Sequence, residues 1–207
     1  MKLGSYSIDV STSGMPQKVA TGFSKVFEGF VGADYQPIAY LGSKLVNGTN
    51  HAILCEQTLV TGKDVKSIVL VVLNEKPGDI DGTAFSIVGI DNLLSNGGAL
   101  GGFNIAPTTT IPDEAKAVFD KAFQGFLGSN VKPFALLATK IVHGVEYAFA
   151  AELSMVIKSG TFTTGNKSIA IVKVFSDYSE VSIDTIIEGY GKAENGKALG
   201  APLGEWP

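Results

Sequence analysis

The sequence predicts an α+β fold of two tandem modules, each with one long helix packed on a curved antiparallel sheet. Three observations lead to this prediction. The chain repeats itself at a spacing of 96 residues, each copy opens with an apolar stripe of helical period, and each copy continues with several strand-like segments bounded by turn residues. A helix followed by four strands, present twice, is an α+β pattern in which the helix covers one face of a sheet.

The repeat is visible when the sequence is aligned on itself. Residues 16–60 and 112–156 align without a gap, with 16 identical pairs in 45. The register returns at an offset of 101, where residues 66–73 face residues 167–174, so the second copy carries five extra residues in a segment rich in Gly and Thr. Such a segment is expected to be a turn, where insertions are tolerated. Internal duplication is the economical interpretation.

The first element of each copy is predicted to be a helix. In the first copy apolar residues fall at i, i+4, i+8 and i+11, which is one stripe of a 3.6-residue period, and they are Val19, Phe23, Phe27 and Phe30. The matching stripe of the second copy consists of Ala115, Phe119, Phe123 and Phe126. Gly32 and Gly128 are expected to end the two helices.

The strands that follow are apolar on both faces. In the first copy they are expected over residues 36–46, 51–60, 66–74 and 82–91. The face under the helix is assigned Ile53 and Cys55, with Phe149 and Ala151 in the second copy. The other face then carries Ala52, Leu54, Ala148 and Ala150. Something must cover that face, and the candidates are the sister module in the same chain or another subunit.

The repeat also predicts the domain boundaries. Module 1 is expected over residues 1–92 and module 2 over residues 111–188, joined by residues 93–110 as a linker that includes the N-terminal strand of module 2. Residues 189–207 are rich in Gly and Ala and are expected to form a C-terminal tail. The only tryptophan, Trp206, lies there, and two interpretations stay open: a disordered end, or an arm that docks on a neighbour.

Composition argues against several classes of function. The chain has 45% hydrophobic and 17% charged residues. Its net charge is -4, so it lacks the positive charge with which proteins attract the phosphates of nucleic acid. The longest apolar run, residues 68–73, is far shorter than a membrane span. The single cysteine, Cys55, cannot form an internal disulfide, and the first residues do not have the pattern of a secretion signal. We therefore expect a cytoplasmic protein that binds neither nucleic acid nor membrane.

Catalytic and metal chemistry also lack a pattern in the sequence. The two histidines, His51 and His143, both lie near a glycine but are not equivalent in the repeat, and no ligand spacing accompanies them. Cys55 lies within a predicted strand, which favours a packed thiol over a nucleophile. We expect no cofactor, no metal and no enzymatic activity.

The turns KLVNGTNHAI and KIVHGVEYAF, which begin at Lys44 and Lys140, resemble the first inhibitory hairpin of the cystatins, Gln-x-Val-x-Gly. Their position between two strands after one helix agrees with that family, and the disulfide-free stefin branch is the most similar. The resemblance implies tandem cystatin-like modules that bind protein partners, such as papain-like proteases, by inserting hairpin loops into a cleft. Such a wedge would inhibit by blocking the cleft, without a covalent step. The glycine would let the backbone approach the cleft closely, and the valine would fill an apolar part of its wall.

The resemblance also implies which residues contact the partner. The wedge tips would be Val46, Asn47 and Gly48 in one copy and Val142, His143 and Gly144 in the other. The second hairpin would carry Pro77 or Tyr178, and flexible trunks would contain Gly4 or Gly14 and the pair Gly101 and Gly102. Lys44 and Lys140 stand where the family has Gln, and a hydrated lysine is costly to bury in a cleft.

Two other interpretations stay open beside the wedge. A Val-x-Gly turn is also what a hairpin of this sheet needs for its bend, without any partner. The chain can alternatively be a structural or assembly protein that forms homo-oligomers through apolar sheet faces and the tail.

Overall fold

The structure, a computed structural model, describes residues 5–60, 64–96, 102–126, 129–159 and 162–191. Half 1 contains β1 (Tyr6–Ser11), α1 (Gln17–Phe27), β2 (Ala33–Val46), β3 (Gly48–Val60), β4 (Asp64–Glu75) and β5 (Phe85–Ser95). Half 2 contains β6 (Asn104–Thr108), α2 (Asp113–Ala122), β7 (Ser129–Ile141), β8 (Val145–Ser159), β9 (Phe162–Phe175) and β10 (Val181–Gly191). The order of strand, helix and four strands therefore occurs twice.

All ten strands belong to one sheet, so the prediction of two tandem cystatin-like modules, each with a long helix on its own sheet, is wrong. The strand order is β5-β4-β3-β2-β1-β10-β9-β8-β7-β6. Neighbouring strands are antiparallel except for β1 and β10, which pair in parallel and join the two halves. This one parallel pair makes the sheet mixed. Because it connects β1 of half 1 to β10 of half 2, neither half has a sheet of its own.

The two helices are shorter than expected. α1 has 11 residues and α2 has 10, and they end at Phe27 and Ala122. Gly29 (φ 74°) and Gly125 (φ 82°) adopt the left-handed conformation soon after these ends, so the chain turns there, before Gly32. Gly128 lies outside the described residues. No helix of the described part of the chain is long and apolar enough to cross a membrane.

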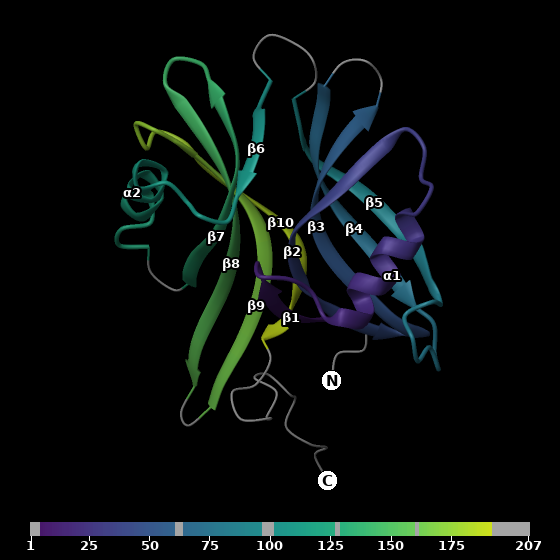
Figure 1. The fold of residues 1–207 in the computed structure, drawn as a ribbon. Helices are drawn as coiled ribbons and strands as arrows, with labels where there is room; N and C mark the ends of the chain where they lie inside the picture. Colours follow the sequence, from purple (N-terminus) through teal and green to yellow (C-terminus); the bar gives the residue numbers. More distant parts are fainter. Residues whose placement is uncertain (1–4, 61–63, 97–101, 127–128, 160–161, 192–207) are drawn as a thin grey trace.

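The molecule has three layers of apolar side chains. α1 lies on the outer face of half 1 and α2 on the outer face of half 2 (Figure 1). Ile53 and Cys55 pack in the cluster under α1, and Phe149 and Ala151 pack in the cluster under α2. The assignment of these faces to the helices is confirmed.

The inner faces of the two halves pack on each other. The central cluster joins residues from both halves, including Ala52, Leu54, Ala148 and Ala150, all fully buried. Burial of both faces explains why these strands are not alternately polar. Of the two expected covers, the structure shows the sister half of the same chain.

The seam between β1 and β10 depends on close backbone approach. Tyr6 pairs with Gly189 and Ile8 with Gly191. A Cβ on Gly189 would lie only 2.0 Å from the Tyr6 carbonyl oxygen, so this position requires glycine. The first residues of the expected tail therefore belong to the sheet, and Trp206 lies outside the described residues.

The extra residues of the second copy lengthen a hairpin. In half 1 the hairpin of β3 and β4 closes at the pair Val60 and Asp64, whereas β8 and β9 stay paired as far as Ser159 and Phe162. The segment expected to be a turn is therefore largely strand, because added residues on both sides of a hairpin can continue its hydrogen-bond ladder.

Candidate protein-binding ends

The β2–β3 hairpin forms one extremity of the molecule. Val46 pairs with Gly48 across the bend, and Gly48 adopts a φ of +95°. The glycine thus lies at a strand-to-strand bend, as predicted, and its conformation is one that a side chain would strain. The side chain of Asn74 on β4 donates to the Asn47 carbonyl oxygen at 3.4 Å and to Asn50 Oδ1 at 2.8 Å. The neighbouring strand therefore supports the tip from one side.

A second turn lies directly beside this hairpin. A Cβ on Gly48 would lie 2.2 Å from the Glu75 carbonyl oxygen and 3.2 Å from Pro77 Cδ. Pro77, which the resemblance assigned to a second hairpin, is therefore brought to the first one. We name residues 44–49 and 75–84 together end 1.

The tip of end 1 presents apolar side chains to solvent. Leu45 is 70% exposed, Val46 is 43% exposed and Ile80 is 92% exposed. Leu45 and Ile80 were missed by sequence reasoning. Adjacent Leu and Val beside the turn glycine were the available signal for Leu45, because side chains at a hairpin bend lie at the surface.

A network of polar groups holds the base of end 1. The Tyr40 hydroxyl lies 3.0 Å from His51 Nδ1, and His51 Nε2 lies 3.0 Å from Glu75 Oε2. Lys18, in the first turn of α1, donates to Glu75 Oε1 at 2.5 Å and also to the carbonyl oxygen of Asp79. The network thus connects α1, β2, β3, β4 and the second turn.

Burial and hydrogen bonding set the charge states in this network. Burial lowers the pKa of His51, although its bond to Glu75 acts in the opposite direction. Burial also tends to raise the pKa of Glu75, but bonds from Lys18 and His51 outweigh it and the pKa of that carboxyl is lowered. The hydrogen bond with Glu75 raises the pKa of Lys18. At neutral pH the network therefore consists of a neutral imidazole, a carboxylate and an ammonium.

The His51 ring of this network and the Cys55 thiol are both buried. The His51 ring is buried against Phe85, with ring centroids 5.8 Å apart. Desolvation raises the pKa of the Cys55 thiol far above its ordinary range, so the thiolate is not formed near neutral pH. Among the described residues no group of His, Cys, Asp and Glu could hold a metal ion.

The β7–β8 hairpin forms the corresponding extremity of half 2. The Val142 amide donates to the Gly144 carbonyl oxygen at 3.0 Å, and Gly144 lies at the bend, as predicted. Ile141 is 80% exposed and Val142 is 52% exposed, and His143 is also exposed. Ile141 was missed, as was Leu45 at the equivalent position.

A second turn also lies beside this hairpin. A Cβ on Gly144 would lie 3.0 Å from both Phe175 Cε1 and Ser176 Oγ. The Ser176 hydroxyl accepts from the Val145 amide at 3.1 Å. Tyr178, at the exposed corner of this turn, has a φ of 66° and lies under Lys121 Nζ at 4.4 Å from its ring centroid. We name residues 140–146 and 175–181 together end 2.

The two lysines that replace the family's Gln lie on the flanks of the hairpins. Lys44 Nζ is 5.8 Å from the ring centroid of Tyr6, and Lys140 Nζ is 5.7 Å from that of Phe103. Both side chains are half-buried. Each ammonium thus lies over an aromatic ring of the neighbouring segment and does not extend from the tip.

The predicted trunks are only partly described. Gly102 is exposed and precedes β6, whose Asn104 pairs with Thr139, so it approaches end 2. Gly14 lies between β1 and α1, away from the tip. Gly4 and Gly101 lie outside the described residues.

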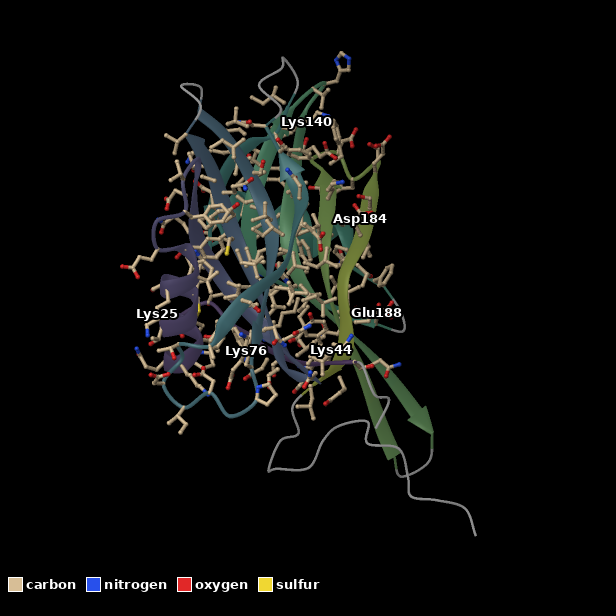
Figure 2. All side chains as sticks on the ribbon, turned by 90° about the vertical axis from the view of Figure 1, so that its right-hand side faces the viewer. Lys25, Lys44, Lys76, Lys140, Asp184 and Glu188 are labelled. Atoms are coloured by element: carbon tan, nitrogen blue, oxygen red, sulfur yellow. The ribbon has the colours of Figure 1, made fainter. Side chains whose placement is uncertain are left out.

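The two ends point in opposite directions. Figure 2 shows Lys44 and Lys76 at one extremity of the molecule and Lys140 at the other. Because one sheet runs through both halves, the orientation of the ends is fixed by the fold.

No protein-family model matches the chain, and no curated protein and no solved structure matches it.

Proposed function

We propose that this chain is a non-catalytic, cytoplasmic protein that binds other proteins by inserting its two ends into their clefts. One observation carries the proposal. Of the twelve large apolar side chains that are exposed in the described residues, seven belong to the two ends: Leu45, Val46, Ile80, Ile141, Val142, Tyr178 and Val181. Apolar side chains gathered at a protruding, backbone-rich tip fit a concave apolar site on another protein.

A papain-like cysteine protease is the first partner to test. A narrow cleft of that kind accepts a hairpin whose tip is Val-x-Gly, because the glycine brings backbone close to the cleft floor. The lysines at positions 44 and 140 do not oppose this proposal, since their ammonium groups lie over Tyr6 and Phe103 on the flanks. They need not be desolvated when the tip enters a cleft.

The experiment is an inhibition assay against a papain-family protease at micromolar concentrations of the chain. We expect inhibition by the wild type, a loss of about tenfold or more in the affinity of the substituted end in V46D or V142D, and a near-complete loss of inhibition for the double variant. V88D is the matched control, because Val88 is exposed on β5 outside both ends. Absence of inhibition by the wild type at micromolar concentration rules out this partner class.

Assembly with a second copy is the alternative function. The apolar inner faces cover each other within one chain, so oligomers would form through other surfaces, among which the ends expose the most apolar side chains. Sedimentation across a concentration series distinguishes the two functions. A concentration-dependent dimer that V46D or V142D dissociates would favour assembly over the binding of a separate partner.

A further inference from the structure

We propose that Lys18 is a positioning residue for end 1: it holds the second turn, residues 76–84, beside the hairpin in the arrangement that binds a partner. This inference rests on the proposed function of end 1 and identifies the residue on which its shape depends. It is argued from the contacts of the turn, the contacts of Lys18, and a contrast with half 2.

The backbone of the turn fixes its shape only in part. The Lys76 amide donates to the Ala84 carbonyl oxygen at 3.0 Å, and the Asp79 amide donates to the Lys76 carbonyl oxygen at a longer 3.3 Å. The turn also contains Gly78 and Gly82, both with positive φ, which are permissive in conformation. Side-chain contacts must therefore supply the remaining constraint.

Lys18 supplies part of that constraint from outside the turn, and inside it the Thr83 amide donates to the carboxylates of Asp79 and Asp81. The Lys18 ammonium donates to Glu75 Oε1 where β4 ends and to the carbonyl oxygen of Asp79 within the turn. The Asp79 carboxylate lies 3.8 Å from the same ammonium, and its side chain is almost completely buried. One cation thus joins the two sides of the turn, and a charged donor gives stronger hydrogen bonds than a neutral one.

The body of α1 also packs on the turn at this point. A Cβ on Gly82 would lie 2.7 Å from the Lys18 carbonyl oxygen and 3.2 Å from Thr21 Cβ. The Glu75 carbonyl oxygen and Pro77 in turn contact Gly48 of the hairpin. A continuous set of contacts therefore leads from Lys18 through the turn to the tip.

Half 2 holds its second turn in a different way. Glu114 stands at the position equivalent to Lys18, and it accepts a hydrogen bond from the Tyr147 hydroxyl at 3.3 Å. The lysine that contacts the second turn of end 2 is Lys121, over the Tyr178 ring. Lys18 and Lys121 thus offer a reciprocal pair of variants, one for each end.

The first test needs no partner. Native-state amide exchange is measured by NMR in K18M, K121M and wild type, with K25M as the control because Lys25 is exposed on α1. We expect K18M to accelerate exchange of the Asp79 and Thr83 amides at least tenfold and to leave the Tyr178 and Ser179 amides unchanged. K121M should leave the Asp79 and Thr83 amides unchanged, and K18R should restore the wild-type rates to within about threefold.

Two outcomes of this test would overturn the proposal. Equal acceleration at both turns would mean that Lys18 only stabilises the whole fold. Unchanged exchange at Asp79 and Thr83 would mean that it does not hold the turn. K18Q, which keeps a shorter polar side chain, gives a second variant if K18M does not fold, and we expect it to show the same localised acceleration.

The second test measures binding in the V142D background, where end 2 is silenced. K18M should weaken inhibition by end 1 at least tenfold, K18R should restore it, and K25M should have no effect. If V142D inhibits and K18M leaves that inhibition intact, Lys18 does not position end 1 for binding. If the wild type does not inhibit, the papain-like partner fails, and the exchange experiment still decides whether Lys18 holds the turn.

Discussion

His51 Nε2 lies 3.0 Å from Glu75 Oε2, and this contact connects the middle of half 1 to the base of end 1. The imidazole is held on its other side by the Tyr40 hydroxyl and is stacked on Phe85. A histidine that is buried and neutral in the folded chain becomes free to take a proton in the unfolded chain. The stability of the protein is therefore linked to pH through this residue.

We predict that stability falls as the solution is acidified. Burial lowers the pKa of His51 from its ordinary value of 6.5, so below that value the unfolded chain binds more protons than the folded one. Urea unfolding should show a loss of stability as the pH falls below 6.5. H51Y, which introduces the residue found at the equivalent position 147, should flatten this part of the profile. H143N is the control, because His143 is exposed, and a profile of H51Y identical to that of the wild type would contradict the prediction.

A further loss of stability is expected at lower pH because of Glu75. The pKa of this carboxyl lies below its ordinary value of 4.5, so its contribution is present above that value and is lost as the pH falls through the folded-state pKa. E75Q should therefore reduce the change in unfolding free energy between pH 5 and pH 3. D91N on the exposed edge of β5 is the control, and an equal reduction in both variants would assign the effect to overall charge.

We predict that the seam between the halves is sensitive to one methyl group. G189A would place a Cβ 2.0 Å from the Tyr6 carbonyl oxygen, which forces β1 and β10 apart. Overpacking of this kind costs roughly 1–3 kcal/mol, measurable as a lower midpoint of urea unfolding. G89A is the matched control in β5, where no atom lies within 4 Å of the added Cβ, and its effect should stay within about 0.5 kcal/mol. Similar losses in both variants would refute the close approach at the seam.

We predict that the described sheet unfolds as one cooperative unit. Leu54 is fully buried in the central cluster, which contains side chains of both halves. L54A should destabilise by about 2–5 kcal/mol and lower amide protection in β8 and β9 as well as in β3. F149A, in the cluster under α2, should shift the same single transition. Two separate transitions, one per half, would contradict a continuous sheet.

The Cys55 thiol should be unreactive in the folded protein. It is fully buried under α1, and burial raises the pKa of its thiol. Labelling by a disulfide reagent should require unfolding of the chain, and it should accelerate in L54A because that variant populates the unfolded state more. A fast reaction under native conditions that is independent of stability would show that the thiol is accessible.

Local sequence patterns were sufficient for part of the fold. The alternation of Ile53 and Cys55 with Ala52 and Leu54 assigned both faces of β3, because side chains of a strand point alternately to the two sides. The glycines of the two Lys-x-Val-x-Gly turns were placed correctly at the bends. The predicted helix lengths were wrong. Phe30 and Phe126 continue the apolar stripe, but they lie after Gly29 and Gly125, where the chain turns.

Long-range pairing was outside the reach of such patterns. β1 is a short strand of mixed polarity, and its partner β10 is more than 180 residues away, so no local periodicity reveals their register. The same limit applies to the candidate site. Lys18 contacts Glu75 and Asp79 across a separation of 57 and 61 residues, and only the folded chain brings these groups together. Sequence reasoning therefore found the tip of end 1 and missed the residue that holds its second turn.

The parallel pairing of β1 with β10 also has a consequence for biosynthesis. Residues 5–11 are synthesised long before β10, and one edge of β1 has no partner until residue 191 has been added. The inner face of half 1 likewise receives its cover only from half 2, whose residues are synthesised later. Half 2 must therefore be synthesised before the nascent chain can bury this face, and β10 before it can pair the free edge of β1, which gives chaperones an interval in which to bind them.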